Sequence, residues 1–162
     1  MKEYDFDGIL EFEGEYLNGE RNGKGKKYNR GDKAFKGEFL NGKIWNGKIY
    51  NKNGEIECKI KDGKGYIKEY DYGELKFEGE YKNGERNGKG KEYNENGELI
   101  FEGEYINGKR WNGKGKEYYY NGKLKFEGEF LNEKIWNGKI YNENGEIECE
   151  IKDGKGYIKE YD

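Results

Sequence analysis

Large apolar residues alternate with charged residues in short runs along the chain. The run from Phe77 to Tyr81, FEGEY, places Phe and Tyr on one side of an extended strand and two glutamates on the other. Asn-Gly pairs follow at 83–84, 87–88 and 96–97. Alternation with a period of two is typical of a half-buried β-strand, and Asn-Gly between two such runs is a strong hairpin signal. The pattern predicts strand, turn, strand and turn, with no room for a helix.

The same pattern restarts along the whole chain. An aromatic residue or isoleucine opens each unit, and the units start near residues 12, 35, 56, 77, 101, 126 and 147. Spacings of 21 to 25 residues are typical of a repeat array, whose members cannot bury their faces alone. Residues 35–71 recur as 126–162 with four differences in 37 positions, which indicates copying of a longer block. The sequence therefore predicts one repeat array over residues 1–162.

Composition determines how thick this array can be. Hydrophobic residues make up 31% of the chain, against roughly 45–50% in ordinary globular proteins. High charge and low hydrophobicity are also typical of disorder, but the net charge is only -3 and the aromatic residues recur at regular spacing. We therefore expect an all-β fold: an elongated, single-layer antiparallel meander of about seven β-hairpins, without helices.

The residue types exclude most catalytic chemistry. The chain contains no Ser, Thr or His, so a hydrolase triad, a His-based metal site and a Ser/Thr-containing phosphate loop are not available. Carboxylate pairs such as Glu13 and Glu15 repeat along the array, and nothing in the sequence places one pair in a cleft. We predict no enzymatic activity, no catalytic residues, no metal site and no cofactor. A pI of about 5.4 with interleaved Glu and Lys argues against nucleic-acid binding.

The repeated segment F-E-G-E-Y-x-N-G-x-x-N-G-K-G resembles the MORN repeat (membrane occupation and recognition nexus), whose usual pattern is Y-x-G-x-W-x-x-G-x-x-x-G-x-G. The positions that match in phase are Phe77, Gly79, Tyr81, Gly84, Gly88 and Gly90, and again Phe12, Gly14, Tyr16, Gly19, Gly23 and Gly25. The resemblance implies an elongated antiparallel meander with one hairpin per repeat, used as a scaffold or interaction module and not catalytic. Binding to membrane lipid is proposed for the family.

Some units depart from the family pattern. An aromatic residue comes one position late at Tyr28 and Tyr93, which predicts a β-bulge at each site. The short units at 56 and 147 carry Cys58 and Cys149 where Gly is expected. We expect both cysteines to be free thiols on the ring-bearing face.

Alternation also predicts two different faces. Phe12 and Tyr16 share one face, and Glu13 and Glu15 share the other. We assign the glycines to the aromatic face, because the rings of neighbouring strands need their space. The charged face should then consist of alternating Glu and Lys rows. Cross-strand pairing is the simpler use of these rows, and an anion-binding surface is the alternative.

The aromatic face is the candidate partner-binding surface. Its rings form either a self-packed spine or also a docking surface, and the tryptophans, which we place in hairpin turns along one rim, either pack on neighbouring hairpins or act as binding anchors. The candidate residues are Phe12, Tyr16, Phe35, Phe39, Trp45, Phe77, Tyr81, Phe101, Tyr105, Trp111, Phe126, Phe130 and Trp136.

Three functions remain open. The first is a scaffold that binds a protein partner, or forms a homodimer, through the aromatic face. The second is a small inhibitor of the immunity type that blocks a target enzyme, and the third is a tether to phospholipid membrane, which is possible but less favoured. The charged segment Met1–Phe12 and the lack of any apolar stretch of ~20 residues lead us to expect a cytoplasmic protein.

Overall fold

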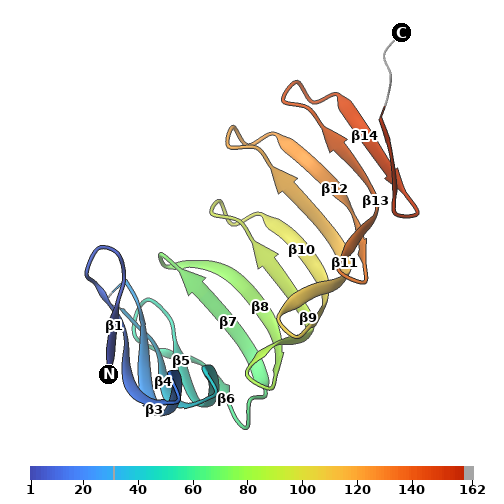
Figure 1. Cartoon of the computed structure of the whole chain (residues 1–162). Helices are drawn as coiled ribbons and strands as arrows, with labels where there is room; N and C mark the ends of the chain where they lie inside the picture. Colours follow the sequence, from blue (N-terminus) through green and yellow to red (C-terminus); the bar gives the residue numbers. More distant parts are fainter. Residues whose placement is uncertain (31, 159–162) are drawn as a thin grey trace.

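The structure is a computed structural model that describes residues 1–30 and 32–158. Every regular element in this part of the chain is a β-strand, and the strands form two open antiparallel sheets in sequence order (Figure 1). The first sheet contains β1 (Lys2–Tyr4), β2 (Leu10–Leu17), β3 (Glu20–Asn29), β4 (Asp32–Leu40), β5 (Lys43–Tyr50) and β6 (Ile56–Ile60). The second contains β7 (Gly65–Asp71), β8 (Glu74–Lys82), β9 (Glu85–Tyr93), β10 (Leu99–Ile106), β11 (Lys109–Tyr118), β12 (Leu124–Leu131), β13 (Lys134–Tyr141), β14 (Ile147–Lys152) and β15 (Lys155–Ile158). The predicted all-β hairpin meander is confirmed.

Asn-Gly turns close the hairpins as the sequence predicts. Asn83 and Gly84 have φ angles of 55° and 74°, and Lys82 pairs with Glu85 across the turn. A two-residue turn with both central residues in the left-handed region matches the twist of the flanking strands, and Asn and Gly tolerate that region best. The amide of Gly84 also donates a 2.9 Å hydrogen bond to the Gly63 carbonyl. Neighbouring hairpins are therefore fastened to each other at their tips.

Glycines pair with glycines across the strands, on the same face as the aromatic rings. Gly79, Gly90, Gly103 and Gly113 form one such row over β8 to β11. A Cβ atom built on Gly90 would lie 2.6 Å from the ring of Phe77. The ring lies flat on the backbone of the neighbouring strand because no side chain separates them. This confirms the assignment of these glycines to the aromatic face. The assignment is wrong for Gly23 and Gly88, which lie next to register shifts: a Cβ atom there would meet the carboxylates of Glu15 and Glu80.

Gly90→Ala should lower the free energy of unfolding by about 1–3 kcal/mol, because the added methyl group overpacks a site already filled by a ring. The exposed neighbour Lys89, replaced by Ala, should change stability by less than about 0.5 kcal/mol. Urea unfolding followed by far-UV circular dichroism measures both variants. Equal stability of Gly90→Ala and the original protein would contradict the packing described above.

Two local predictions concern bulges and tryptophans. The ladder shifts register between Lys27 and Tyr28, and Tyr93 lies opposite Leu99 at another shift, so the bulges are confirmed. The tryptophans, however, do not lie in turns. Trp45, Trp111 and Trp136 are the third residues of β5, β11 and β13, because each follows its two-residue turn by three positions.

The charged face also differs from prediction in the first sheet. Glu and Lys alternate across most of the second sheet, as between Glu78 and Lys91. In the first sheet, Lys26, Lys36 and Lys48 are direct cross-strand neighbours. The prediction of alternating rows is therefore wrong here, because Lys36 occupies a position where most other units carry Glu.

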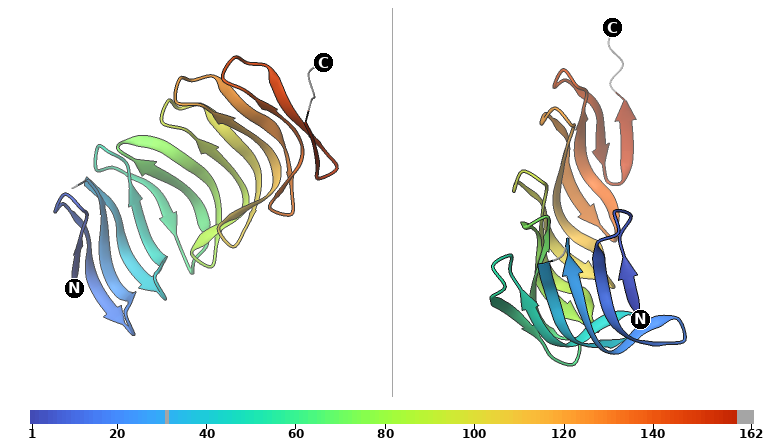
Figure 2. Two further views of the ribbon diagram at one scale, coloured as in Figure 1. Left: turned by 45° about the horizontal axis from the view of Figure 1, so that its top comes forward. Right: turned by 90° about the vertical axis from the view of Figure 1, so that its left-hand side faces the viewer.

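The ladder is interrupted between β6 and β7. Only an isolated bridge between Lys61 and Lys64 joins these strands, and the first sheet curls at the amino-terminal end of the ribbon (Figure 2). Side chains reach across the interruption instead: the Asn29 amide donates a 2.6 Å hydrogen bond to the Tyr70 carbonyl, and Lys43 forms a 2.7 Å ion pair with Glu85. The ring-bearing face of the first sheet thus faces β7 and β8.

Candidate functional site

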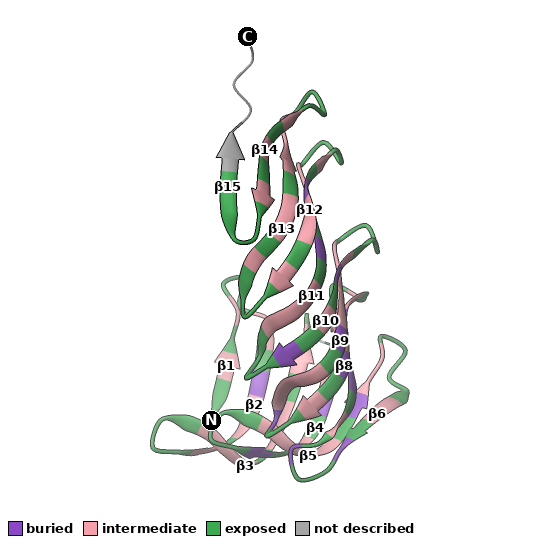
Figure 3. Ribbon diagram, turned by 90° about the vertical axis from the view of Figure 1, so that its right-hand side faces the viewer, coloured by how far each residue is buried: buried purple, intermediate pink, exposed green. Residues whose placement is uncertain are grey.

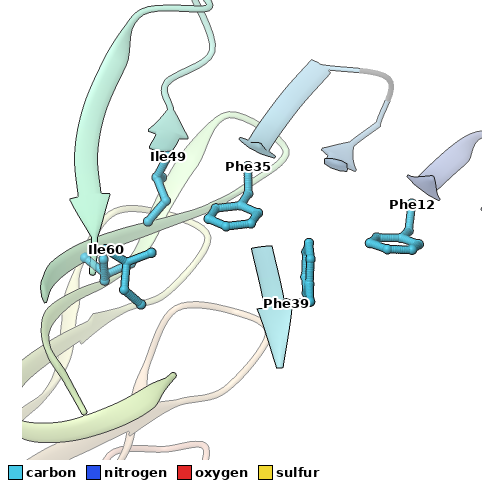
Figure 4. Close-up of a cluster of buried hydrophobic side chains, with 6 residues drawn as sticks. Phe12, Phe35, Phe39, Ile49 and Ile60 are labelled. Atoms are coloured by element: carbon cyan, nitrogen blue, oxygen red, sulfur yellow. The ribbon is translucent and has the colours of Figure 1, made fainter. Parts of the chain in front are cut away.

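Aromatic rings pack edge to face along the inner face of each sheet. In the first sheet, the Phe39 ring lies 5.1 Å, centroid to centroid, from both Phe12 and Phe35, and Ile49 and Ile60 extend the cluster (Figure 4). In the second sheet, neighbouring rings in the order Phe77, Tyr105, Phe101, Phe130 and Phe126 have centroids 5.2 to 6.0 Å apart. Edge-to-face packing is a favourable arrangement for aromatic pairs. The rings form the core of each sheet, and in the first sheet Ile67 of β7 and Tyr81 of β8 pack against the same cluster.

Most of these rings have no free surface. Phe12, Phe77 and Phe101 are 0% exposed and Tyr105 is 1% exposed; Phe35, Phe39 and Phe126 are also buried. Buried segments lie within the strands, whereas the hairpin loops are largely exposed (Figure 3). The rings therefore form a self-packed spine. Partner binding by these particular rings stays a prediction, and it would require either movement of the covering groups or access from an open part of the face.

Arginines cover the rings. The guanidinium carbon of Arg21 lies 4.4 Å from the Phe12 centroid, that of Arg86 lies 4.2 Å from Phe77, and that of Arg110 lies 4.8 Å from Phe101. A cation over a ring face is attracted by the ring quadrupole, and a planar guanidinium also excludes water. Sequence reasoning missed this role. The sequence did contain a signal for this role, because three of the four arginines occupy equivalent positions in their units. Arg21 and Arg86 directly precede an Asn-Gly pair, and Arg110 is separated from its Asn-Gly pair by Trp111.

Carboxylates hold these arginines in place. Glu92 forms ion pairs with both Arg86 and Arg110, and Glu69 accepts hydrogen bonds from Arg86 Nε at 2.8 Å and Nη2 at 2.9 Å. The Tyr81 hydroxyl donates to the same carboxylate at 2.6 Å. Burial alone would raise the pKa of Glu69, but these charged and neutral donors outweigh it and lower the pKa. These ion pairs and hydrogen bonds hold Arg86 and Arg110 over the rings of the second sheet, near its junction with the first sheet.

The lowered pKa of Glu69 makes stability depend on pH. The folded state favours the carboxylate, so this contribution is present above the unfolded pKa of about 4.3 and is lost as pH falls through the folded value. Glu69→Gln should be less stable than the original protein at neutral pH. It should also lose less stability between about pH 5 and pH 3. Urea unfolding at a series of pH values tests this, and parallel pH profiles for the two proteins would contradict it.

The aromatic face stays open at the junction of the two sheets. A groove of about 540 Å³ lies between β3, β4 and β5 on one side and β7 and β8 on the other. Four half-buried tyrosines and three isoleucines, of which Ile49 and Ile67 are buried, form its wall, namely Tyr28, Tyr50, Tyr70, Tyr81, Ile44, Ile49 and Ile67. Charged groups that border it include Lys27, Lys33, Asp32 and Asp71. An apolar concavity with a few charged groups at its border is the usual form of a binding site. We call this concavity the junction groove.

The structure separates the predicted site residues. Phe35, Phe39 and Tyr81 line the junction groove. The Tyr16 ring packs on Phe12 with the two centroids 5.6 Å apart, and its buried hydroxyl has no hydrogen-bond partner among residues 1–30 and 32–158. The remaining candidate rings lie outside the groove, in the spine of the second sheet or near the hairpin tips.

The rings of Trp45 and Trp136 pack against neighbouring hairpins. A Cβ atom on Gly63 would lie 2.6 Å from the Trp45 ring, and one on Gly154 would lie 3.4 Å from the Trp136 ring. Trp111 is half-buried, and its carbonyl accepts a 3.1 Å hydrogen bond from the amide of Glu133. Trp136 remains 38% exposed. These contacts describe packing, and a role as binding anchors stays a prediction.

Both cysteines are free thiols, as expected. Cys58 packs against the core cluster of the first sheet, and burial raises the pKa of its thiol. A raised pKa keeps a thiol protonated and poorly reactive at neutral pH.

Comparison with known protein families identifies repeats in three places. The MORN repeat matches residues 12–33 and 77–98, and a MORN repeat variant matches residues 111–132. The comparison with curated proteins gives no match. Over residues 1–30 and 32–158 there is no helix with the length and apolar character needed to span a membrane.

Proposed function

Because the chain is a MORN-repeat protein, we propose that it is a non-enzymatic interaction module that binds a protein partner through the junction groove. MORN repeats commonly take part in protein or membrane interactions and are generally not catalytic. The observation that carries the proposal is the open concavity of about 540 Å³ on the otherwise self-packed aromatic face.

The wall of the groove favours a protein segment as its occupant. Tyrosine offers a large apolar ring and a hydroxyl that tolerates a half-wet surface, which is why it is enriched in protein interfaces. The Tyr50 ring is half-buried at the groove, with the Lys33 ammonium 4.3 Å from its centroid. Charges of both signs at the border, such as Lys27 and Asp71, suit a polypeptide that presents an apolar side chain between polar groups.

A photocrosslinking residue at the groove tests the proposal. Replacing Tyr50 by p-benzoylphenylalanine in the source cells should yield one discrete crosslinked protein, whereas the same replacement at the fully exposed Tyr120 should not. The identified protein should then bind the purified chain. Tyr50→Ala should weaken that binding by about tenfold or more, and Tyr120→Ala should leave it unchanged. Circular dichroism of both variants controls for folding.

Several outcomes would overturn or redirect the proposal. Equal crosslinking from positions 50 and 120, or an unchanged affinity of Tyr50→Ala for the identified protein, would show that the groove is not part of the binding interface. Crosslinking of the chain to itself, with a concentration-dependent mass in light scattering, would replace the partner by a second copy. If the identified partner is an enzyme that loses activity on binding, the module acts as an inhibitor. Cosedimentation with anionic liposomes, lost in Tyr50→Ala, would instead support a membrane tether.

A further inference from the structure

Four lysines lie side by side on the charged face of the first sheet, opposite the junction groove. Lys26 pairs in register with Lys36, Lys36 with Lys48, and Lys48 with Lys59. They come from the adjacent strands β3, β4, β5 and β6. We call them the lysine row. Like charges directly opposite each other on neighbouring strands destabilise a sheet, so the row needs an explanation beyond folding.

The second sheet shows that the fold does not require such a row. There, Lys68, Glu78, Lys91, Glu102 and Lys114 alternate in charge across five strands. The duplicated block gives a closer comparison, because it carries Glu127 and Glu150 where the first block carries Lys36 and Lys59. Lys139 lies between these two glutamates in register. The chain therefore contains two copies of one block: in the second copy opposite charges face each other across the strands, and in the first copy like charges do.

The lysine row is largely unneutralised within the protein. Lys26 forms a 2.9 Å ion pair with Glu13 at one end of the row. Among the described residues, no carboxylate forms an ion pair with Lys36, Lys48 or Lys59, and all three are exposed. Part of the row lines an open hollow of about 1060 Å³, to which Lys2, Lys24, Lys26, Lys36 and Lys61 all contribute. This side of the sheet is a concentrated source of positive potential on a protein with a net charge of -3.

We propose that the lysine row binds an acidic segment of a protein partner. Strand spacing of ~4.8 Å gives the row a span of about 14 Å, the length of about four residues of extended chain. A segment with several Glu or Asp side chains would neutralise the ammonium groups and relieve their repulsion. The surface lies on the opposite face of the sheet from the junction groove, so it does not depend on the function proposed for that groove.

The surroundings favour an acidic polypeptide over other anions. Among the described residues that line the hollow there is no aromatic ring, on which the bases of single-stranded nucleic acid stack, and no arginine, which binds phosphate groups through two parallel hydrogen bonds. Carboxylates of Glu13, Glu38 and Asp62 border the hollow. They would repel a broad anionic surface such as a bilayer, but they leave room for a narrow segment aligned with the row.

Charge reversal within the chain supplies a matched pair of variants. Lys36→Glu/Lys59→Glu gives the first block the charges of the second at these two positions, and Glu127→Lys/Glu150→Lys does the reverse. Both patterns already occur in this fold, so both variants should fold. The first should be at least as stable as the original protein, because cross-strand repulsion becomes attraction. A residue pattern kept at a cost in stability is typical of a functional surface.

The probe is a fluorescein-labelled hexaglutamate peptide, with hexaglutamine as the neutral control, measured by fluorescence anisotropy at low and physiological salt. The original protein should bind hexaglutamate at one site and more weakly at higher salt. Lys36→Glu/Lys59→Glu should bind at least about tenfold more weakly. Glu127→Lys/Glu150→Lys should gain a second site, because Lys116 and Lys139 then complete an equivalent row.

Other results would overturn the proposal. Unchanged hexaglutamate affinity in Lys36→Glu/Lys59→Glu would exclude the row as the site. Tighter binding of tripolyphosphate, an oligonucleotide or phosphatidylserine vesicles than of hexaglutamate would assign the row to that anion instead. Self-association that disappears in the same variant would assign it to a second copy. Crosslinking from position 50 should persist in this variant, so failure here and failure of the groove proposal can be told apart.

Discussion

Tyr105→Ala should lower the free energy of unfolding by about 3–5 kcal/mol. The ring is 1% exposed and lies between Phe77 and Phe101, with centroids 5.2 and 5.3 Å away. Its removal leaves a cavity in the spine of the second sheet between Phe77 and Phe101, under the covering Arg86. Urea unfolding followed by tryptophan fluorescence measures the effect, since Trp111 and Trp136 both lie in this sheet.

Tyr105→Phe is the control for this prediction. Among the described residues the buried Tyr105 hydroxyl has no well-formed hydrogen bond, although the Arg110 guanidinium lies beside it, so its removal should cost much less than removal of the ring. A cost for Tyr105→Phe as large as that for Tyr105→Ala would mean that the hydroxyl, and not ring packing, carries the contribution.

Glu92→Ala should destabilise the protein by about 2–3 kcal/mol, because two guanidiniums lose their shared partner. The Glu92 side chain is 16% exposed and forms ion pairs with Arg86 and Arg110. Both arginines cover rings of the spine, so the variant should also let water reach that surface. Thermal unfolding by circular dichroism measures the loss.

Glu95→Ala serves as the matched control for Glu92→Ala. Glu95 is exposed in the turn that follows β9, and its replacement should change stability by less than about 0.5 kcal/mol. Similar melting temperatures for the two variants would show that the arginines hold their positions without Glu92.

The fold could be predicted because turns and glycines fix the register locally. Once Asn83 and Gly84 form a tight turn, Tyr81 lies opposite Arg86, and the bulge that follows places Gly79 opposite Gly90 with the ring of Phe77 against both. A slip by one residue would move every ring to the charged face, so few alternatives compete. The same constraint repeats in each unit, and this is why seven short hairpins could be located without any long-range information.

The site was harder to predict, because it depends on partners that are distant in sequence. Arg86 meets Glu69 and Phe77 only after three strands are aligned, and alternation alone does not tell which side of a bulged strand a guanidinium reaches. The junction groove needs the first sheet to fold over β7 and β8, which no single repeat encodes. The lysine row could have been predicted from the strand register. It was missed because the charged face was described by the pattern common to most units, in which the position of Lys36 is occupied by Glu.

The interruption between β6 and β7 is set by context and not by local sequence. The segment from Lys61 to Ile67 recurs unchanged from Lys152, where Lys152 pairs with Lys155 and Ile151 with Gly156 in a continuous ladder. Only the bridge from Lys61 to Lys64 forms in the first copy. Tension applied to the two ends of the ribbon is carried elsewhere by rows of backbone hydrogen bonds, but at this point by the Lys61–Lys64 bridge, the bonds at the hairpin tips and a few side-chain contacts. We expect the molecule to yield here first under load, which would separate Ile67 and Tyr81 of the second sheet from the ring cluster of the first.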